Sequence, residues 1–494
     1  MPFKFKDKPK EPHLETMIDG HGQFYRIDFY NNKTQLSFYD SSKKYKMELE
    51  DVAKIFKIPG KSKLLLGYRP VGREVTDWEW ERVVGDTRIL AVAMRWQKAQ
   101  GLTGLTIASD ALHAYKNMIG RGEFRRRHPK LDLSLDQMLR PAYRGGWTYL
   151  NPVYKEEYLK NIYVFDINSM YPACMAGMHG EKLPYGLCRR VDEDYQLQDD
   201  EIDIIKIYSK PSLKEGCFPW IHYCNVNGHT NEEFIIDCEI PIELTLTRPD
   251  YELFLETYND DDYSGVLDRF VFKCEIGMFS EYVEYWNKVK EESAARHDMG
   301  MRQLAKDMMN NLSGRFALNP DRESKIPIFD EEKNKVTYEP VDSPTSPLYV
   351  PTSAFITGHS RSRIIRDAMK FKDKFVYADT DSLHILGEGI DFNKYIEIDK
   401  YKLGYYKNEE IWNEGKYLRS KAYIHKGRNI ETDKDDKEVK CGGLPKKAKE
   451  FVDFDNFYIG SEIEGKLMGR VVPGGYLLRE TTFKINEKEF WGLK

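Results

Sequence analysis

Cysteine is scarce in this sequence of 494 residues, which has seven, an odd number scattered along the chain. Such usage argues against the disulfide framework of small secreted domains and suits a reducing compartment. One group of cysteines and histidines suggests zinc, but it contains no C-x-x-C pair, so a zinc site is disfavoured. Its members are Cys217, His222, Cys224, His229 and Cys238.

Long apolar runs are also absent, so the sequence predicts neither a membrane span nor a signal peptide. A basic excess is missing too, because the net charge is −5 at pH 7. Positive charge is instead local: one cluster lies in residues 121–130, and another occupies residues 416–428. Such patches can contact phosphates in spite of the overall negative charge. The length is enough for three or four domains, and a composition of 31% charged and 41% hydrophobic residues predicts a soluble globular protein.

What the sequence does have is a pair of aspartates two residues apart, Asp379 and Asp381, between apolar runs at 375–377 and 383–386. The alternation predicts a strand, a tight turn and a strand, with both carboxylates at the hairpin tip. Carboxylates so close repel each other unless a cation lies between them, and magnesium prefers oxygen ligands. An Asp-x-Asp pair alone is weak evidence, because turns are generally rich in aspartate.

A third acid, Asp166, strengthens this interpretation. It follows the β-branched and aromatic run 161–165 and precedes residues 167–172, which end in Pro172. Proline suits the first turn of a helix, so the segment predicts a strand, a turn and a helix start whose N–H groups could bind phosphate. Two strands that each present acid at one end predict a two-metal site for phosphoryl displacement. A capping or turn role for Asp166 is the simpler alternative.

Residues 302–315 could supply positive charge to such a site. They are rich in helix formers, and a glycine near the end predicts the helix stop. Lys306, Asn310 and Ser313 fall at i, i+4 and i+7, so they share one face. Arg302 lies one turn earlier. The functional interpretation is a helix that binds a triphosphate and faces the incoming sugar and base, whereas the alternative is a solvated amphipathic helix.

Together these segments resemble motifs A, B and C of family B DNA polymerases, in the family's order. The three motifs are Asp-Ile-Asn-Ser-Met-Tyr-Pro at 166–172, the helix from Lys306 to Gly314, and Tyr-Ala-Asp-Thr-Asp-Ser at 377–382. Residues 143–146 resemble the Tyr-x-Gly-Gly motif, and residues 421–423 the Lys-x-Tyr motif. The likeness is greatest to the protein-primed DNA polymerases of small tailed bacteriophages.

The resemblance implies a role for each motif residue. Asp166, Asp379, Asp381 and Lys306 would be catalytic. Asp166, Asp381 and the carbonyl of Ile167 would bind two Mg²⁺ ions, for which Mn²⁺ could substitute. The incoming nucleotide would contact Ile167, Met170, Tyr171, Arg302, Lys306, Asn310 and Ser313, with Tyr171 excluding a 2′-hydroxyl. DNA would contact Tyr143, Gly145, Gly146, Thr380, Lys421 and Tyr423. Of these, Lys421 and Tyr423 would hold the primer terminus.

The implied reaction is templated nucleotidyl transfer. A primer 3′-hydroxyl, or at initiation a side-chain hydroxyl of a terminal protein, would attack the α-phosphate of a dNTP. The implied partners are template and primer DNA, dNTPs and a terminal protein, with no membrane, in the cytoplasm of a bacterial host that replicates a linear phage-type genome. A metal-dependent nuclease could use the same carboxylates, but it would not need the Lys306 helix. A catalytically inactive DNA-binding scaffold would not need the acids.

The implied fold class is α+β: a right-hand polymerase with palm, fingers, thumb and a partial ribonuclease-H-like exonuclease remnant. Two family insertions are expected, the first contacting the terminal protein and the second a β-hairpin that supports processivity and strand displacement. The polar run 431–440 is expected to be an exposed loop. In chain order, the expected parts are the truncated exonuclease-like domain (1–105), palm (106–178), first insertion (179–278), fingers (279–316), second insertion (317–348), palm (349–440) and thumb (441–494).

Two departures from the family pattern matter. Ser313 stands where motif B usually carries tyrosine, which predicts weaker rejection of sugar-modified nucleotides. The polar leader at residues 1–10 has no Asp-x-Glu, and the first residues that match the family already lie past its first two exonuclease motifs. The partial third motif keeps Asp86 but has Arg82 in place of tyrosine. One acid cannot bind two metals, so no complete 3′–5′ exonuclease site is expected here, and Asp86 is expected to be structural. The other half would be a separate polypeptide docking on residues 1–105, lost, or trimmed away, with the first two favoured.

Overall fold

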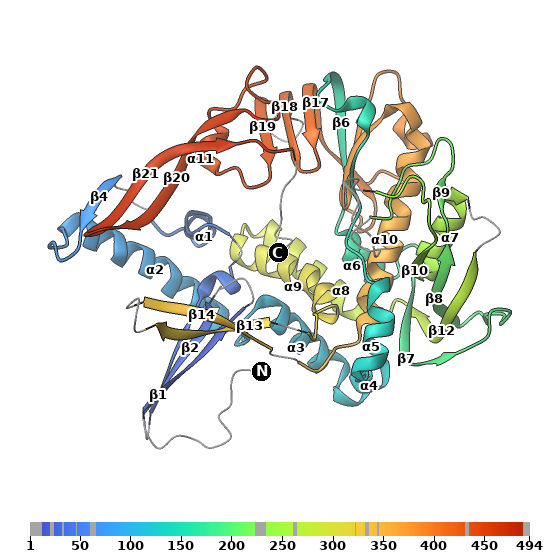
Figure 1. The fold of residues 1–494 in the computed structure, drawn as a ribbon, viewed down its shortest axis with the longest axis horizontal. Coiled ribbons are helices and arrows are strands. Elements are labelled where there is room, and N and C mark those ends of the chain that lie inside the picture. Colours follow the sequence, from blue (N-terminus) through green and yellow to red (C-terminus); the bar gives the residue numbers. More distant parts are fainter. Residues whose placement is uncertain are drawn as a thin grey trace.

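The structure is a computed structural model, drawn as a ribbon in Figure 1. The residues that it describes are 12–19, 24–31, 34–45, 47–59, 66–222, 234–259, 264–321, 323–330, 335–342, 345–429 and 434–487. Part of the cysteine and histidine group, Cys224 and His229, lies outside these ranges. No helix among the described residues is both long enough and apolar enough to span a bilayer.

The centre of the fold is a seven-stranded antiparallel sheet with the order β19-β18-β17-β6-β16-β15-β5. Alternate side chains of its strands point to opposite faces, and two separate hydrophobic clusters cover these faces. Helix α10 (Val350–Phe371) packs on one face, against β15 and β16. The strands are β5 (Thr148–Leu150), β6 (Tyr158–Ile167), β15 (Phe375–Asp379), β16 (Ser382–Leu386), β17 (Tyr406–Arg419), β18 (Ala422–Asn429) and β19 (Lys434–Cys441).

The prediction of an exposed loop at 431–440 is wrong for the residues that the structure describes, because residues 434–440 belong to β19. A polar strand of this kind has no alternating apolar residues, and its backbone hydrogen bonds to the neighbouring strand stabilise it. Here β18 pairs with β19 from Ala422–Cys441 to Asn429–Lys434.

A second, four-stranded sheet with the order β10-β8-β12-β7 lies beside α10 (Figure 1). Its edge strand β10 leads directly into α7 (Arg248–Thr257), which packs against α10. The sheet lies within residues 179–278, the range predicted for the first insertion. Its strands are β7 (Lys182–Arg190), β8 (Glu201–Ser209), β10 (Ile242–Thr247) and β12 (Gly265–Ile276), and β9 (Ser212–Leu213) pairs separately with β11 (Tyr258–Asn259).

Two antiparallel helices, α8 (Ser280–Ala295) and α9 (Met299–Phe316), follow this sheet and pack on α3. The predicted stop at Gly314 is wrong, because α9 continues to Phe316. Leu312 and Phe316 are fully buried on the apolar face of α9, and this packing outweighs the low helix propensity of one glycine. The remaining helices of this region are α3 (Ile107–Ile119), α4 (Arg121–Arg127), α5 (Leu133–Leu139) and α6 (Met170–Met175).

The predicted hairpin after α9 is confirmed as β13 (Glu323–Asp330) and β14 (Lys335–Asp342). It contacts the N-terminal three-stranded sheet, where Asp19 bridges Ser324 and the Phe24 and Tyr338 rings meet edge to face. That sheet consists of β1 (His13–Ile18), β2 (Phe24–Asn31) and β3 (Thr34–Tyr39).

The N-terminal region also joins the C-terminal region. Strand β4 (Gly67–Pro70) pairs with β21 (Gly475–Lys484), which in turn pairs with β20 (Glu462–Val472). Lys446 of α11 (Lys446–Lys449) forms ion pairs with Glu48 and with Asp51 of α1 (Leu49–Ile55). Helix α2 (Asp77–Ala99) completes the N-terminal region. Residues 12–99 therefore connect the hairpin to the C-terminal strands.

Candidate active site

The structure brings the segments of Asp166 and Asp381 together at one end of the central sheet. Strand β6 pairs with β16 so that Asp166 lies opposite Ser382, and the Ile167 N–H donates to the Asp381 carbonyl at 2.8 Å. Both local predictions are confirmed: 375–386 form strand, turn and strand, and 158–175 form a strand, a turn and helix α6. Thr380, at the hairpin tip, takes a left-handed conformation with φ of 64°.

The two acids share one electrostatic environment. Burial, followed by the charges of Asp381 and Glu409, raises the pKa of Asp166 to about 8. Burial, with the charges of Asp379 and Glu409, raises the pKa of Asp381 to about 6. The Lys306 ammonium lowers both pKa values, so α9 presents its positive charge to this pair. An oxygen donor set with uncompensated negative charge is one that Mg²⁺ fits.

Asp379 differs from the other two acids because its carboxylate already has a cationic partner. Lys421 Nζ donates to its two oxygens at 2.7 and 2.9 Å, and Thr148 Oγ1 donates at 3.2 Å. Lys421 lies in a left-handed conformation between β17 and β18, and its N–H donates to the Tyr377 hydroxyl at 3.0 Å. The Lys-x-Tyr segment is therefore fixed to the hairpin that carries Asp379 and Asp381.

Only part of the predicted α9 face is open. Arg302, Lys306 and Asn310 are exposed, but Ser313 is 5% exposed and its hydroxyl donates to the Asn310 carbonyl at 3.4 Å. Helix α10 covers this end of α9, because the Ser353 hydroxyl donates to the Ser313 carbonyl.

The side chains after Asp166 also differ in access. Met170 is buried in the core, so only its main chain is available to a ligand. Tyr171 is half-buried and packs against both hydrophobic clusters that flank the start of α6. Tyr423 is buried, with its ring 5.6 Å from that of Tyr377.

The Tyr-x-Gly-Gly segment touches the hairpin tip directly. A Cβ on Gly146 would lie 2.6 Å from the Thr380 methyl group, so this close approach requires glycine. The Trp147 carbonyl accepts from the Thr380 N–H at 2.7 Å. Tyr143 is half-buried and packs on the cluster that includes α9, while Gly145 is exposed.

Two residues that support this segment escaped the sequence analysis. Arg361 of α10 donates to the carbonyls of Arg144 and Gly145 at 2.9 and 2.6 Å, and it forms a buried bidentate pair with Asp250 of α7. The pair links the second sheet to the Tyr-x-Gly-Gly segment. No local pattern marks either residue, because they are 111 positions apart.

Asp86 lies on α2 with its carboxylate 4.0 Å from the Arg82 guanidinium. An ion pair of this kind fits the expected structural role.

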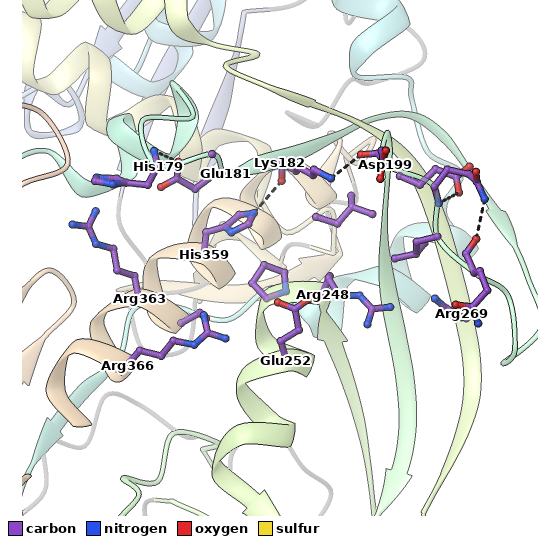
Figure 2. A pocket seen from close by; sticks show the side chains of 18 of the residues that line it. His179, Glu181, Lys182, Asp199, Arg248, Glu252, Arg269, His359, Arg363 and Arg366 are labelled. Carbon is purple, nitrogen blue, oxygen red and sulfur yellow. Dashed lines mark hydrogen bonds between the residues drawn. The ribbon is translucent and has the colours of Figure 1, made fainter. Parts of the chain in front are cut away.

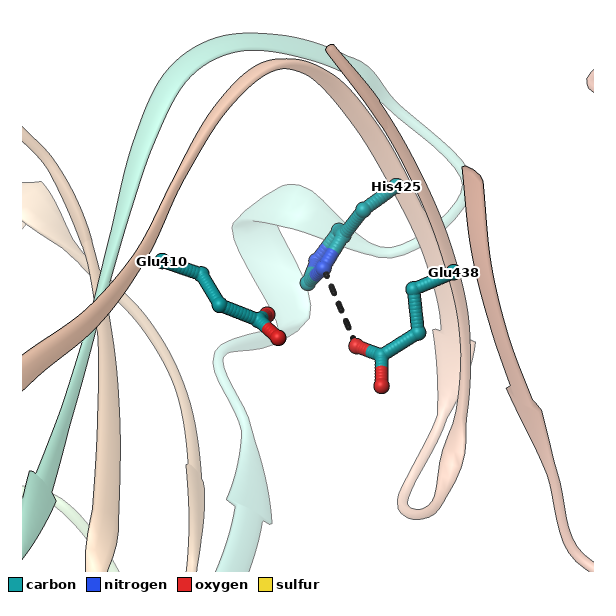
Figure 3. A group of neighbouring side chains, drawn as sticks. All are labelled: Glu410, His425 and Glu438. Carbon is teal, nitrogen blue, oxygen red and sulfur yellow. Dashed lines mark ion pairs between the residues drawn. The ribbon is translucent and has the colours of Figure 1, made fainter. Parts of the chain in front are cut away.

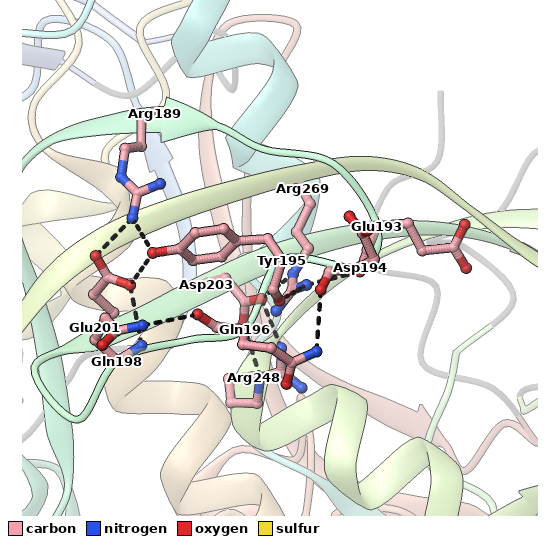
Figure 4. A network of polar contacts seen from close by, with 10 residues as sticks. All are labelled: Arg189, Glu193, Asp194, Tyr195, Gln196, Gln198, Glu201, Asp203, Arg248 and Arg269. Carbon is pink, nitrogen blue, oxygen red and sulfur yellow. Dashed lines mark hydrogen bonds and ion pairs between the residues drawn. The ribbon is translucent and has the colours of Figure 1, made fainter.

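A polar pocket of about 830 Å³ lies between α10 and the second sheet (Figure 2). Its wall includes Arg363 and Arg366 of α10 and Arg248 and Arg269 of the second sheet region. The last two arginines bind buried Asp203, Arg248 at 2.8 and 2.6 Å and Arg269 at 2.6 Å (Figure 4). The pocket wall is therefore charged, and buried Asp203 holds two of its arginines.

The acids at two strand ends, the lysine-bearing helix and the glycine-rich contact at the hairpin tip define a polymerase palm with its fingers helix. The sequence profile described as "DNA polymerase type B, organellar and viral" matches residues 97–395. The chain belongs to this family and is a DNA-directed DNA polymerase, a nucleotidyltransferase.

Individual relatives agree with this assignment. The chain is 34% identical to the DNA polymerase of Bacillus phage B103, over 98% of this chain and 87% of the relative. It is 35% identical to the DNA polymerase of Bacillus phage phi29, over 95% and 84%. The structure matches phi29 DNA polymerase complexed with primer-template DNA and incoming nucleotides, with a TM-score of 0.85 and 33% identity over 95% of this chain and 85% of that one. The palm, fingers and thumb architecture predicted from the motifs is confirmed.

Proposed function

We propose that this polymerase works by two-metal nucleotidyl transfer at Asp166 and Asp381. The observation that carries the proposal is the pairing of β6 with β16, in which two half-buried acids of separate motifs lie within the field of Lys306. Mg²⁺ held by both carboxylates and the Ile167 carbonyl would supply Lewis acidity at the reacting oxygens. Lys306 is placed to neutralise charge on the triphosphate and the departing pyrophosphate.

The other motif residues position the substrates. Lys421 holds Asp379, so the segment that would bind the primer terminus is coupled to the catalytic hairpin. Tyr171 packs below the sugar site, and Tyr143, Gly145, Gly146 and Thr380 contact DNA at the hairpin tip. Arg302 and Asn310 lie on the open face of α9, where they would contact the incoming nucleotide.

Initiation would use a terminal protein hydroxyl in place of the primer. The second sheet and its pocket would form the contact with that protein, and the support of Arg361 by Asp250 links this contact to the palm. The test mixes the chain with template, Mg²⁺ and dNTPs, with and without a candidate priming protein. Primer extension and a nucleotidylated protein are expected. Extension without any nucleotidylated protein would contradict protein priming while leaving the polymerase assignment intact.

The β13–β14 hairpin would support processivity and strand displacement, because it follows the fingers helix α9 in the chain and contacts the N-terminal sheet. Deleting 320–345 should shorten products and impair strand displacement while sparing single additions on open templates. Unchanged product length on a duplex template would refute this role.

A second candidate function is the catalytic half of a split polymerase whose exonuclease half is a separate polypeptide. One face of the β1–β2–β3 sheet favours it: Leu14, Phe29 and Leu36 pair in one row across the strands and are 61%, 37% and 53% exposed. An apolar row of this kind is typical of a covered surface. The chain alone should not degrade mismatched primers from the 3′ end. Metal-dependent degradation that Asp86→Ala abolishes would contradict this candidate.

A further inference from the structure

A second group of metal-type ligands lies in the middle of the central sheet, away from the strand ends that carry the catalytic aspartates. His425 of β18 pairs directly with Glu438 of β19, and Glu410 projects from β17 (Figure 3). One potential ligand atom from each residue lies within 4.8 Å of the others. These three residues, called here the strand cluster, come from three adjacent strands, so the sheet register alone brings them together.

The imidazole of His425 is the observation that points to a ligand. The residue is 0% exposed, and its Nδ1 has no hydrogen-bond partner among the residues that the structure describes. This nitrogen faces Glu438 Oε2 at 3.8 Å, which is too long for a hydrogen bond (Figure 3). Buried polar atoms are rarely left unsatisfied, so an atom aimed at two carboxylates requires an explanation.

The opposite nitrogen of the ring is held in place. His425 Nε2 lies 2.8 Å from the Tyr417 hydroxyl, which lies 2.7 Å from His384 Nδ1. If Nε2 carries the proton and donates to Tyr417, the Tyr417 hydroxyl donates to His384, and the lone pair of His425 Nδ1 faces the carboxylates. Metal-binding histidines are commonly oriented by such a hydrogen bond from the other ring nitrogen.

Each carboxylate is oriented in a similar way. Trp412 Nε1 donates to Glu410 Oε2 at 2.7 Å, and Lys440 Nζ donates to Glu438 Oε1 at 2.9 Å. One oxygen of each group is thus fixed by a donor, and the other oxygen remains for a ligand. The Glu438 side chain is 25% exposed, so a metal ion can enter beside it and the side chain has room to move toward His425.

We propose that the strand cluster binds one divalent transition-metal ion of the zinc type through His425 Nδ1 and one oxygen each of Glu410 and Glu438. One imidazole and two carboxylates suit Zn²⁺, whereas Mg²⁺ prefers oxygen ligands alone. The bound ion would cross-link β17, β18 and β19. The His425 ring stacks on that of Tyr423 at 4.6 Å, so the ion would also fix the ring that is expected at the primer terminus.

The test uses Co²⁺ as a spectroscopic probe of the full chain, with excess Mg²⁺ to occupy the oxygen-only catalytic site. One equivalent of Co²⁺ should give d–d absorption bands and a paramagnetically shifted, exchangeable imidazole N–H proton, and Zn²⁺ should displace it. The shifted proton identifies nitrogen coordination, which the aspartates of the active site cannot give.

Variants connect the signal to the strand cluster. Glu438→Gln should weaken Co²⁺ binding at least about tenfold and lower the thermal midpoint measured with Zn²⁺, without changing the metal-free midpoint. Glu414→Gln, on the same strand as Glu410 but outside the cluster, is the matched control and should bind as the parent chain does. Both variants should be checked by circular dichroism. Absence of a shifted imidazole proton, or equal Co²⁺ affinity of the parent chain and Glu438→Gln, would overturn the proposal.

Discussion

Two groups of acidic side chains lie on the same seven-stranded sheet but at different positions along its strands. Asp166, Asp379 and Asp381 lie at strand ends and a hairpin tip, next to a helix that brings Lys306. The strand cluster lies in the middle of its strands, and its members are oriented by a tryptophan, a lysine and a tyrosine. Side chains at strand ends leave space for a substrate, whereas side chains in the middle of the sheet are oriented by contacts with their neighbours. The first position suits chemistry, and the second suits a structural ion.

The largest expected effect separates these two groups. Asp166→Asn should lower primer extension at least about 10³-fold, because one metal ligand at the reacting phosphate is lost. Assayed with Mg²⁺ alone, so that the strand cluster holds no ion, Glu410→Gln should leave extension close to the parent rate, although it removes a carboxylate from the same sheet. Single-turnover extension measures both, with DNA binding as the control for folding. Similar losses in the two variants would remove the distinction.

Lys306 should have the next largest effect. Lys306→Met should lower the rate of extension about 10²-fold, since an electrostatic contact to the triphosphate and the leaving pyrophosphate disappears. Lys288→Met is the matched control, because this α8 lysine is exposed and its ion pair is a long contact of 4.0 Å with Glu292. A loss of the same size in the control would show that general positive charge, and not the Lys306 position, matters.

Mg²⁺ binding should depend on pH in a direction set by the raised pKa values of Asp166 and Asp381. Without metal, the stability that the protonated carboxyls supply is present at low pH and is lost as the pH rises through about 6 and about 8. Mg²⁺ binds only the deprotonated pair, so its affinity should rise about tenfold or more between pH 6 and pH 8. Thermal shifts with and without Mg²⁺ measure this change. Asp381→Asn should flatten it, and an equally steep rise in that variant would contradict the assignment.

The smallest effect concerns sugar selection. Ser313→Tyr should raise discrimination against sugar-modified nucleotides by about 2- to 10-fold, because a ring would fill space beside the nascent base pair. Since Ser313 is buried, the larger side chain should also cost about 1–3 kcal/mol of stability. Ser313→Ala is the control, with selectivity near that of the parent chain. An unchanged selectivity ratio in Ser313→Tyr, measured by competing dNTPs and modified nucleotides, would show that the position does not contribute.

The difference between the two groups also explains what the sequence could predict. The acids to which we assign catalysis lie in short motifs with strong local patterns, so strand, turn and helix start could all be assigned before the structure. Glu410, His425 and Glu438 share no motif, and they meet only through the register of β17, β18 and β19. No pattern in the sequence marked β19 itself, because its polar residues resemble a loop until they form a hydrogen-bonded ladder with β18.

The sequence also could not reveal which distant residues support the motif segments. The Arg361–Asp250 pair holds the Tyr-x-Gly-Gly segment from two helices that only tertiary packing brings together. Gly314 shows the opposite case, since a correct local rule for helix stops was outweighed by the buried face of α9.

The most direct test of the account is pyrophosphate release in a single turnover with primer-template DNA, a matching dNTP and Mg²⁺. The parent chain should release one pyrophosphate for each nucleotide added, and Asp381→Asn should release almost none while it binds the same DNA with similar affinity. Pyrophosphate release by Asp381→Asn at a rate near that of the parent chain would contradict catalysis by the paired acids of β6 and the β15–β16 hairpin.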